Sequence, residues 1–265
     1  MKQNQGNKEY PPGSPGALWH YSISFIADTA SVAEHYHHCY KIVVSLDNSF
    51  ECMIDGQAFF GLKGFIINQS IPHSCFAPDA NVLVNFIESD SLLGWQLRDL
   101  LAGKAYLNID SVLSTEQYSQ VLPPNYTELS NETLIPYVNT FLDSLLLNAR
   151  PASDIVTDER IVVILQYIEQ HLSETIDLEH LAGLINLSSE RTRHLFVQEM
   201  GIPFTQYIMW QRIRKTMVVA ITEESKLIEA CLRFGFTDQP HFNRTFKRIF
   251  GMTPGGIIRY CRVLM

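Results

Sequence analysis

The sequence contains no uninterrupted apolar run close to the roughly 18 residues that a membrane-spanning helix needs, so no membrane span is expected. The first fifteen residues are polar and lack the basic start and apolar centre of a secretory signal. The five cysteines are scattered and form no CxxC pair, which argues against a disulfide framework and against a structural zinc site. Together these absences favour a protein of the reducing cytoplasm.

Charged residues are few, at 18% of the chain against 46% hydrophobic residues, as in an ordinary globular protein. A length of 265 residues favours two domains. The formal net charge of −8 at first argues against a nucleic-acid partner. The charge is unevenly distributed, however: residues 1–157 carry −9, residues 158–201 carry −5 and residues 202–265 carry +6. A phosphate-binding surface is therefore expected in the last of these segments.

The N-terminal half is predicted to consist of short strands followed by two helices. Residues 19–26, 40–46, 50–54, 65–68 and 82–87 are rich in β-branched and aromatic residues, with turn signals such as Asp55-Gly56 between them. This pattern is typical of a sandwich or barrel. Leucines at helical spacing then predict helices over 92–100 and 134–146, on either side of Pro123-Pro124. The apolar face of the second helix is either internal core or a dimer surface.

The C-terminal half is predicted to be helical from residue 158 to the end. A linker at residues 150–153, with Pro151 as the helix breaker, separates it from the first half. Asp158 (or Thr157), Asp177, Ser188 and Asp238 are each suited to cap a helix N-terminus. A longer helix of about 20 residues is expected over 203–222, opened by Pro203.

A pattern of short helix, tight turn and second helix occurs twice, about 50 residues apart. Each first helix has a small residue, Ala182 or Cys231, where two helices must cross closely. Each turn has a residue that tolerates left-handed geometry, Asn186 or Gly235. The second helix of each pair has one apolar and one polar face. This is the pattern of a helix-turn-helix, whose second helix enters the major groove.

The connecting helix suggests how the two units are spaced. A helix of about 20 residues is roughly 30 Å long, and one turn of B-DNA is about 34 Å. We therefore expect the second helices of the two units, near residues 189–200 and 239–250, to lie parallel on one side of the molecule. In that arrangement they would fit consecutive major grooves.

Two stretches of sequence resemble a known family. The first unit contains Leu178-x-x-Leu181-Ala182, Leu187-Ser188, Leu195-Phe196 and Gly201, and the second contains GFTDQPHFNRTFKRIFGMTP at residues 235–254. Both resemble the DNA-binding domain of the AraC/XylS family of bacterial transcription regulators, over about residues 158–262. The chain departs from the family pattern at Thr192, Thr216, Gly255-Gly256 and Ile258. These departures affect the expected packing of the helices and not the resemblance itself.

By their position in the motif, polar residues on the two second helices are candidates to contact DNA. The candidates for reading bases are Glu190, Arg193, His194, Gln239, His241, Asn243 and Arg244. Arginine suits guanine, and glutamine or asparagine suits adenine, through paired hydrogen bonds. The candidates for holding phosphates are Arg212, Lys215, Lys247 and Arg248. Because residues 158–201 are acidic, we expect the second unit to supply most of the electrostatic affinity.

A histidine cluster in the first half, His35-x-His37-His38 followed by His73, resembles the metal motif of cupin barrels. If His35 and His37 lie on one strand, their side chains share a face. Lys41 stands where the cupin motif has a glutamate, however, and its cation would repel a metal. We therefore expect no metal and no cofactor, and assign His35, His37, His73 and Phe60 to an effector pocket.

The expected fold class is α+β. Residues 1–150 form a cupin-like barrel or jelly roll with dimerisation helices, and residues 151–265 form an all-α domain with two helix-turn-helix motifs. The resemblance implies a regulator that binds double-stranded DNA in the bacterial cytoplasm, associated with the nucleoid. It also implies homodimers, with RNA polymerase and a small-molecule effector as further candidate partners.

Two alternatives remain, and both are enzymes. A metal-dependent cupin enzyme fused to a DNA-binding tail would need a complete set of metal ligands. A DNA-repair methyltransferase would need a reactive cysteine beside zinc-type spacing, which Cys39, Cys52 and Cys75 do not show. The expectation is a regulator without enzymatic activity.

Overall fold

The computed structural model describes residues 22–28, 30–145, 158–223 and 225–264. The predicted linker at 150–153, and with it the expected domain boundary, lies outside these ranges. The start of the first predicted strand, the end of the helix predicted over 134–146 and the alternative cap Thr157 also lie outside them.

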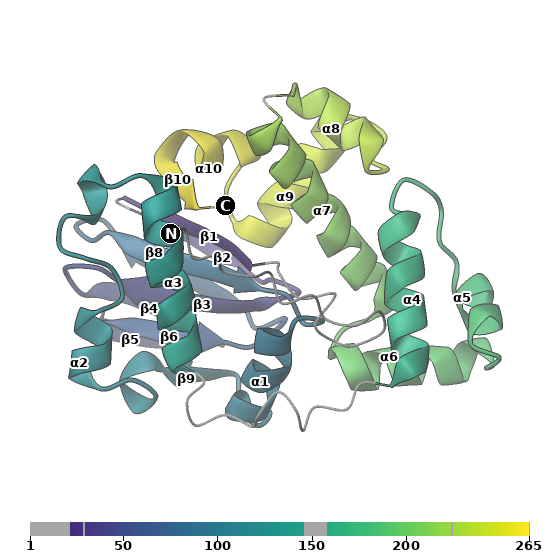
Figure 1. Cartoon of the computed structure of the whole chain (residues 1–265), viewed down its shortest axis with the longest axis horizontal. Helices are drawn as coiled ribbons and strands as arrows, with labels where there is room; N and C mark the ends of the chain where they lie inside the picture. The colour runs from purple at the N-terminus through teal and green to yellow at the C-terminus, as the bar shows by residue number, and fades with distance from the viewer. Residues whose placement is uncertain (1–21, 29, 146–157, 224, 265) are drawn as a thin grey trace, which may run out of the picture.

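The strands of the described residues form two antiparallel sheets that face each other (Figure 1), which confirms the expected sandwich. The six-stranded sheet has the order β10-β1-β8-β3-β6-β9 and the four-stranded sheet the order β2-β7-β4-β5. In chain order the strands are β1 (Ser22–Ala27), β2 (Ala30–His35), β3 (Tyr40–Ser45), β4 (Phe50–Ile54), β5 (Gln57–Leu62), β6 (Gly64–Ile67), β7 (His73–Ala77), β8 (Val82–Ile87), β9 (Tyr106–Asn108) and β10 (Cys261–Leu264).

The six-stranded sheet is covered on both faces, which explains why its central strands are mostly apolar. All residues of β3 and β8 are buried. One face, with Val43 and Val84, packs into the interior of the sandwich. The other face, with Ile42 and Leu83, packs under α1 (Leu92–Leu101) and α3 (Asn131–Leu145). Strands covered on both sides lose the polar alternation of a half-exposed sheet.

The apolar face of α3 is internal core. Its buried residues are Leu134, Val138, Phe141, Leu142 and Leu145, and all of them join the cluster beneath the six-stranded sheet. The sequence left open whether this face is core or a dimer surface, and the structure places it within the chain. A short helix, α2 (Thr115–Ser119), precedes α3.

The C-terminal half contains seven helices in the described residues, and four of them begin at the predicted caps. Asp158, Asp177, Ser188 and Asp238 each accept a hydrogen bond from a backbone N–H of the first turn. The helices are α4 (Glu159–Gln170), α5 (Leu178–Leu184), α6 (Ser189–Met200), α7 (Phe204–Thr222), α8 (Leu227–Arg233), α9 (Gln239–Phe250) and α10 (Pro254–Tyr260).

The expectation of helix up to the end of the chain is wrong for residues 261–264. These residues form β10, which pairs with β1 at the edge of the six-stranded sheet. Arg262 fixes the strand, because its side chain donates to Asn131 Oδ1 at 2.8 Å and to the carbonyl of Tyr126 at 2.9 Å. The C-terminus thus returns to the sandwich of the first half.

Helix α7 connects the two parts of the helical half and also contacts the sandwich. In Figure 1 it runs diagonally from α6 towards α8, beside the ends of the strands. Trp210 of α7 is buried, and its ring centroid lies 6.0 Å from that of Phe86 in β8. The helices α4, α5 and α6 form a separate apolar cluster with the beginning of α7.

Candidate nucleic-acid interface and interior pocket

The two helix-turn-helix units have the same turn geometry. In the first, Asn186 has φ 53° and the N–H of Leu187 donates to the carbonyl of Ala182 at 3.1 Å. In the second, Gly235 has φ 81° and the N–H of Phe236 donates to the carbonyl of Cys231 at 3.0 Å. Ala182 and Cys231 are both buried at the helix crossing. The predicted repeat is therefore confirmed in its backbone as well as its sequence.

The second helix of the first unit, α6, has its three candidate base-reading residues on the surface. Glu190, Arg193 and His194 are all exposed. Glu190 accepts from Arg193 at 2.6 Å and contacts His194 at 2.7 Å, so the three side chains form one exposed group. Base contacts by Arg193 would require this ion pair to open, which costs little at an exposed site.

The second helix of the second unit, α9, presents a basic surface. Arg244, Lys247 and Arg248 are exposed, while Gln239 and His241 are half-buried. His241 Nδ1 lies 3.0 Å from the hydroxyl of Thr237. Asn243 is also half-buried, and its Oδ1 is buried without a hydrogen-bond partner. The opposite side of α9 packs Phe242, Phe246 and Ile249 into the core, as the sequence predicted.

Two of the predicted phosphate-binding residues already have contacts within the protein. The guanidinium of Arg212 donates to the carbonyls of Leu172 at 2.8 Å and Glu174 at 2.6 Å, just after α4. Lys215 pairs with Glu169 of α4 at 3.1 Å. Both side chains therefore fasten α7 to the end of α4, which is a structural role that their positive charge did not reveal.

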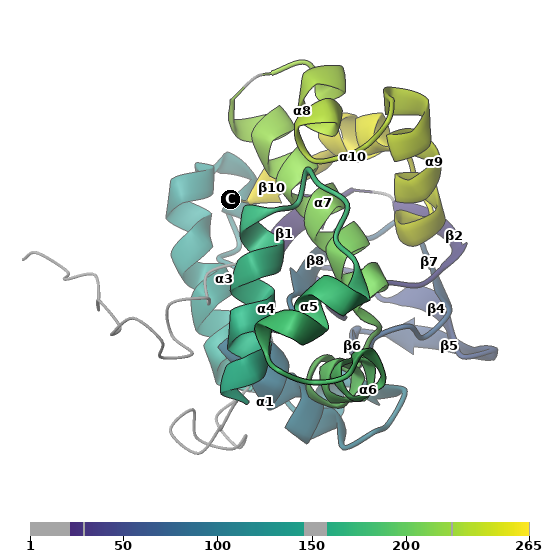
Figure 2. The same ribbon diagram turned by 90° about the vertical axis from the view of Figure 1, so that its right-hand side faces the viewer.

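The expectation that α6 and α9 lie parallel is wrong for this structure. In Figure 2, α6 is seen end-on, whereas the axis of α9 lies in the plane of the picture. Each helix is held at a different place on the first half of the chain, α6 at α1 and α9 at β2. Two helices in this arrangement do not fit consecutive major grooves of a straight duplex, because each groove requires its own helix in the same orientation.

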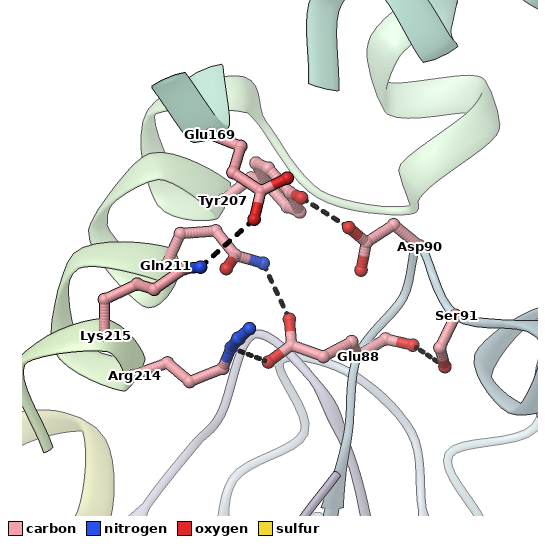
Figure 3. Close-up of polar contacts among 8 residues, drawn as sticks. All are labelled: Glu88, Asp90, Ser91, Glu169, Tyr207, Gln211, Arg214 and Lys215. Carbon is pink, nitrogen blue, oxygen red and sulfur yellow. Dashed lines mark hydrogen bonds and ion pairs between the residues drawn. The ribbon is translucent and has the colours of Figure 1, made fainter. Parts of the chain in front are cut away.

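Five residues, here called the clasp, connect the end of β8 to α7: Glu88, Asp90, Tyr207, Gln211 and Arg214 (Figure 3). Arg214 Nε lies 3.1 Å from Glu88 Oε1, and both side chains are almost completely buried, at 3% and 4% exposed. Gln211 Nε2 donates to Glu88 Oε2 at 2.7 Å, and the hydroxyl of Tyr207 donates to Asp90 Oδ2 at 2.5 Å.

Burial governs the ionisation of the clasp. Loss of solvation raises the pKa of Glu88 to about 7, although Arg214 opposes the shift. Burial also raises the pKa of Asp90, against the hydrogen bond from Tyr207. Glu88 is therefore an acid that titrates near neutral pH at the contact between the two halves.

Other contacts hold the ends of α6 and α9 against the first half of the chain. Arg98 Nη1 of α1 donates to the carbonyl of Glu199 at 2.8 Å. At the end of α9, Gly251 has φ +70°, and a Cβ added there would lie 2.7 Å from Val32 Cγ1 and 2.9 Å from the carbonyl of Ala33. The first half of the chain thus holds α6 and α9 separately, at the C-terminal end of each helix.

A pocket lies inside the sandwich, and its wall is completed by the second helix-turn-helix unit. It contains about 30 Å³ of free space, which is room for one or two water molecules. Its lining residues come from both sheets and from the C-terminal half: Phe25, Ala27, Ala30, Val32, His35, Lys41, Val43, Cys75, Val82, Val84, Phe86, Phe250, Met252 and Ile257.

Of the four predicted pocket residues, His35 lines the pocket, and His37 and His73 cluster with it without lining the pocket themselves. His35, His37 and His73 are buried, and one ring nitrogen from each lies within 4.8 Å of the others. His35 ends β2 and His37 lies beyond it, so the condition that both lie on one strand is not met. Phe60 does not line the pocket, since it is 70% exposed on β5. Its neighbour Phe59 has the inward position.

Lys41 is the charged residue of the pocket wall. It is buried on β3, and its Nζ lies 3.2 Å from His73 Nε2. Burial lowers the pKa of Lys41. Burial, followed by the charge of Lys41, lowers the pKa of His35 to about 3, and burial also lowers the pKa of His37 and His73. The three imidazoles are therefore neutral at physiological pH.

The sequence did not point to the clasp. Glu88 and Asp90 directly follow the apolar strand β8, and acidic residues at the end of a buried strand are a weak signal for a polar contact. Arg214 lies on the same helix as Arg212 and Lys215, and its burial could not be read from that pattern. The partners are more than 110 residues apart in the chain.

Comparison with protein families gives a match to a helix-turn-helix domain over residues 181–259. The probable transcriptional regulator LumQ of Photobacterium leiognathi is 25% identical over 244 residues, which cover 87% of this chain and 94% of LumQ. The arabinose operon regulatory protein of Escherichia coli K12 is 33% identical over 98 residues, 37% of this chain and 35% of that protein. The chain thus spans nearly all of LumQ and about a third of the arabinose regulator.

Among solved structures, the fold is similar to that of ToxT from Vibrio cholerae. The apo form of a ToxT point variant superposes with a TM-score of 0.58 at 14% identity, over 92% of this chain and 98% of ToxT. A fatty-acid-bound form has a TM-score of 0.53 at 14% identity, over 91% and 95%. No helix of the described residues is long and apolar enough to cross a membrane. The C-terminal half carries a helix-turn-helix domain of the AraC type, and the chain is a DNA-binding transcription regulator.

Proposed function

We propose that this regulator binds consecutive major grooves only after α6 and α9 have moved relative to each other, and that the sandwich controls this movement. The observation that carries the proposal is the buried contact between Glu88 and Arg214. It ties α7, the connection between the two helix-turn-helix units, to the first half of the chain. Breaking the contact frees α7 without altering any exposed candidate DNA contact.

In the DNA-bound form, the exposed polar residues of α6 and α9 would read bases. Glu190, Arg193 and His194 would do so in one groove, and the group Gln239, His241, Asn243 and Arg244 in the next. Lys247 and Arg248 would hold phosphates, because they are exposed on α9 and carry the charge that phosphates need. Arg212 and Lys215 could join them only by giving up their contacts with the end of α4.

The interior pocket would receive a small effector. Its walls are apolar apart from His35 and Lys41, which suits a molecule with an apolar body and one anionic group. ToxT has been crystallised with an unsaturated fatty acid and with a naphthalenyl butenoic acid, both of this chemistry. The free space of about 30 Å³ is too small for such a ligand. Entry would therefore require Phe250, Met252 and Ile257 to move away, and α9 with them.

The resemblance to the AraC/XylS family supports proposals about further properties of the regulator. It would act in the cytoplasm at the nucleoid as a homodimer on paired half-sites, with RNA polymerase as a further partner. It would act by binding and not by catalysis. Burial raises the pKa of Cys39, Cys52 and Cys75, in the case of Cys52 to about 12, so none is a ready nucleophile.

The test is DNA affinity at pH 8 for the wild type, Arg214→Met and the double variant Glu88→Gln/Arg214→Met. The DNA is a duplex selected by the wild type from a random pool. Arg214→Met leaves Glu88 buried without this partner, so the contact should open and the affinity should rise about tenfold or more. In the double variant neither charge remains, and the affinity should return towards that of the wild type.

Unchanged affinity in Arg214→Met, with a folded protein by circular dichroism, would show that the clasp does not restrain DNA binding. Equal gains in the single and double variants would assign the effect to lost packing at Arg214. For the effector, a long-chain unsaturated fatty acid should change the DNA affinity of the wild type and have a weaker effect on Lys41→Met. Equal effects on both proteins would exclude Lys41 as the anion contact.

A further inference from the structure

We propose that His35, His37 and His73 form a binding site for one divalent transition metal ion of the zinc class. The sequence argued against a metal because Lys41 stands where the cupin motif has a glutamate. The structure shows that the three histidines converge in spite of this substitution. One nitrogen of each ring lies within 4.8 Å of the others, and all three side chains are buried. The inference goes beyond the regulator function and does not depend on it.

The orientation of two of the rings is fixed by the backbone. His35 Nδ1 lies 2.6 Å from the carbonyl of Ala33, and His73 Nδ1 lies 2.8 Å from the carbonyl of Ile71. A hydrogen bond from Nδ1–H to a carbonyl leaves the lone pair on Nε2. This is the arrangement in which proteins present histidine to a metal, with the second nitrogen held by an outer partner.

The spacing of the donors agrees with coordination. His35 Nε2 and His37 Nε2 lie 3.1 Å apart. Two nitrogen ligands on a tetrahedral zinc ion, with bonds of 2.0–2.1 Å, lie roughly 3.3 Å apart. The ring of His73 is adjacent to both, with centroids 4.4 Å from His35 and 5.1 Å from His37. Imidazole nitrogen is a preferred donor for zinc and the neighbouring divalent metals.

The size of the pocket favours an ion over a larger ligand in this conformation. The free space of about 30 Å³ beside His35 and Lys41 admits one or two waters, and a metal ion with one water occupies a similar volume. His37 also has a buried Nδ1 without a hydrogen-bond partner. The polar contact of this ring is the one between its Nε2 and His35 Nε2, and coordination through Nε2 would replace that contact with a bond to the ion.

Lys41 competes with the metal for His73. Its Nζ lies 3.2 Å from His73 Nε2, which is the atom that would have to bind the ion. Coordination must break this contact, and a cationic Lys41 would also repel the ion. Removing the amine should therefore strengthen metal binding. If Lys41 only supported the structure of the site, its removal would weaken metal binding instead.

The site lies directly beneath the end of α9. The ring centroid of His37 is 5.3 Å from that of Phe250, and Gly251 approaches His35 so closely that an added Cβ would lie 2.9 Å from Nδ1. A metal that fixes these two rings would thus act on the residues that hold the second helix-turn-helix unit.

The experiment uses the full chain after treatment with a chelator, titrated with Co²⁺ and followed by its visible absorption, with Zn²⁺ as competitor. The wild type should bind one equivalent of Co²⁺, which Zn²⁺ displaces. His73→Gln and His35→Gln should weaken binding by at least about tenfold. Lys41→Met should strengthen it by a similar factor. His38→Gln is the matched control, because His38 is a buried neighbour outside the cluster.

Two outcomes would overturn the proposal: no stoichiometric Co²⁺ binding in either the wild type or Lys41→Met, or undiminished binding in His73→Gln. If the histidine variants do not fold, the comparison of wild type and Lys41→Met decides. Zn²⁺ should then raise the melting temperature of both proteins, and more strongly for Lys41→Met. Absence of any Zn²⁺-dependent rise would contradict the site. None of these measurements involves DNA, so their failure leaves the proposed function untouched.

Discussion

Glu88 lies where an apolar strand ends, and its carboxylate has two partners from α7. A buried ion pair is weak support for stability, because removing two charges from water costs about as much as their attraction returns. In the folded chain the pKa of Glu88 is about 7, because the loss of solvation raises it more than the attraction of Arg214 lowers it. The clasp therefore contributes little to the stability of the fold. It favours one position of α7, because Arg214 pairs with Glu88 only when α7 lies against the end of β8.

The stability of the protein should respond to the titration of Glu88. The pKa of Glu88 is raised in the folded state. Its contribution to the free energy of unfolding is therefore fully present below about pH 4.5 and is lost as the pH rises through about 7. Glu88→Gln imitates the protonated acid. Urea unfolding should find variant and wild type about equally stable at pH 5, and the variant more stable at pH 8 by about 1–3 kcal/mol. A variant that loses stability at pH 8 would show that the ionised pair stabilises the fold.

Gly251 illustrates a close approach that only glycine permits. Its φ of +70° is left-handed, and Val32 Cγ1 and the carbonyl of Ala33 leave no room for a Cβ. Gly251→Ala should lower the free energy of unfolding by about 2–4 kcal/mol. Gly103→Ala is the control, because Gly103 has φ +79° with nothing within 4 Å, and should cost about 1 kcal/mol. Equal losses in thermal unfolding would mean that α9 does not depend on the contact with β2.

At the scale of elements, α6 and α9 are similar in form and different in charge. α6 has Glu190 in its first turn, which pairs with Arg193, whereas α9 carries exposed Arg244, Lys247 and Arg248. Both helices are capped at the start by a side chain and end at a left-handed glycine. The difference in charge supports the expectation that the second unit supplies most of the electrostatic affinity for DNA.

This division of roles predicts a change in salt dependence. Lys247→Gln and Arg248→Gln should each reduce the slope of log affinity against log salt by about 1, with a similar loss for all DNA sequences. Lys226→Gln is a matched control, because Lys226 is an exposed lysine that precedes α8. Affinity measured from low to moderate salt checks the slopes. An unchanged slope in both α9 variants would remove these residues from the phosphate contacts.

Helix capping and the pattern of apolar residues predicted those helices and strands whose signals lie within a few neighbouring residues. The caps Asp158, Asp177, Ser188 and Asp238 start helices because their side chains accept from the next turn. The strands β2, β5, β7, β9 and β10 were missed. β2, β5 and β7 mix polar with apolar residues, and β9 and β10 have only three and four residues. Phe60 was placed in the pocket wrongly, since successive residues of a strand point to opposite faces and Phe59 takes the inner one.

The candidate site depends on contacts between residues that are far apart in the chain, and sequence patterns over a few residues do not predict such contacts. The two helix-turn-helix units could be recognised because each is completed within about 25 residues. The crossed arrangement of α6 and α9 could not, because it depends on Glu88 meeting Arg214 and on the end of α9 meeting β2. The convergence of His73 with His35 and His37 likewise depends on the pairing of β2 with β7.

At the scale of the whole molecule, one helix connects DNA recognition to the sandwich. α7 contacts α4 through Arg212 and Lys215, and it contacts β8 through the clasp. The last strand, β10, returns the chain to the same sheet. A ligand in the pocket beneath Phe250 would act on α9, and a change at Glu88 would act on α7, so both signals converge on the relative position of the two recognition helices.

The most direct test of this account is the distance between α6 and α9 in solution. Spin labels at the exposed positions Val197 and Lys247 report it by pulsed electron paramagnetic resonance, with and without the selected DNA duplex. We expect one distance distribution in the free wild type, a second distribution on DNA, and a population of the second in free Arg214→Met. The same distribution in all three samples, with DNA bound at two consecutive major grooves, would contradict the account.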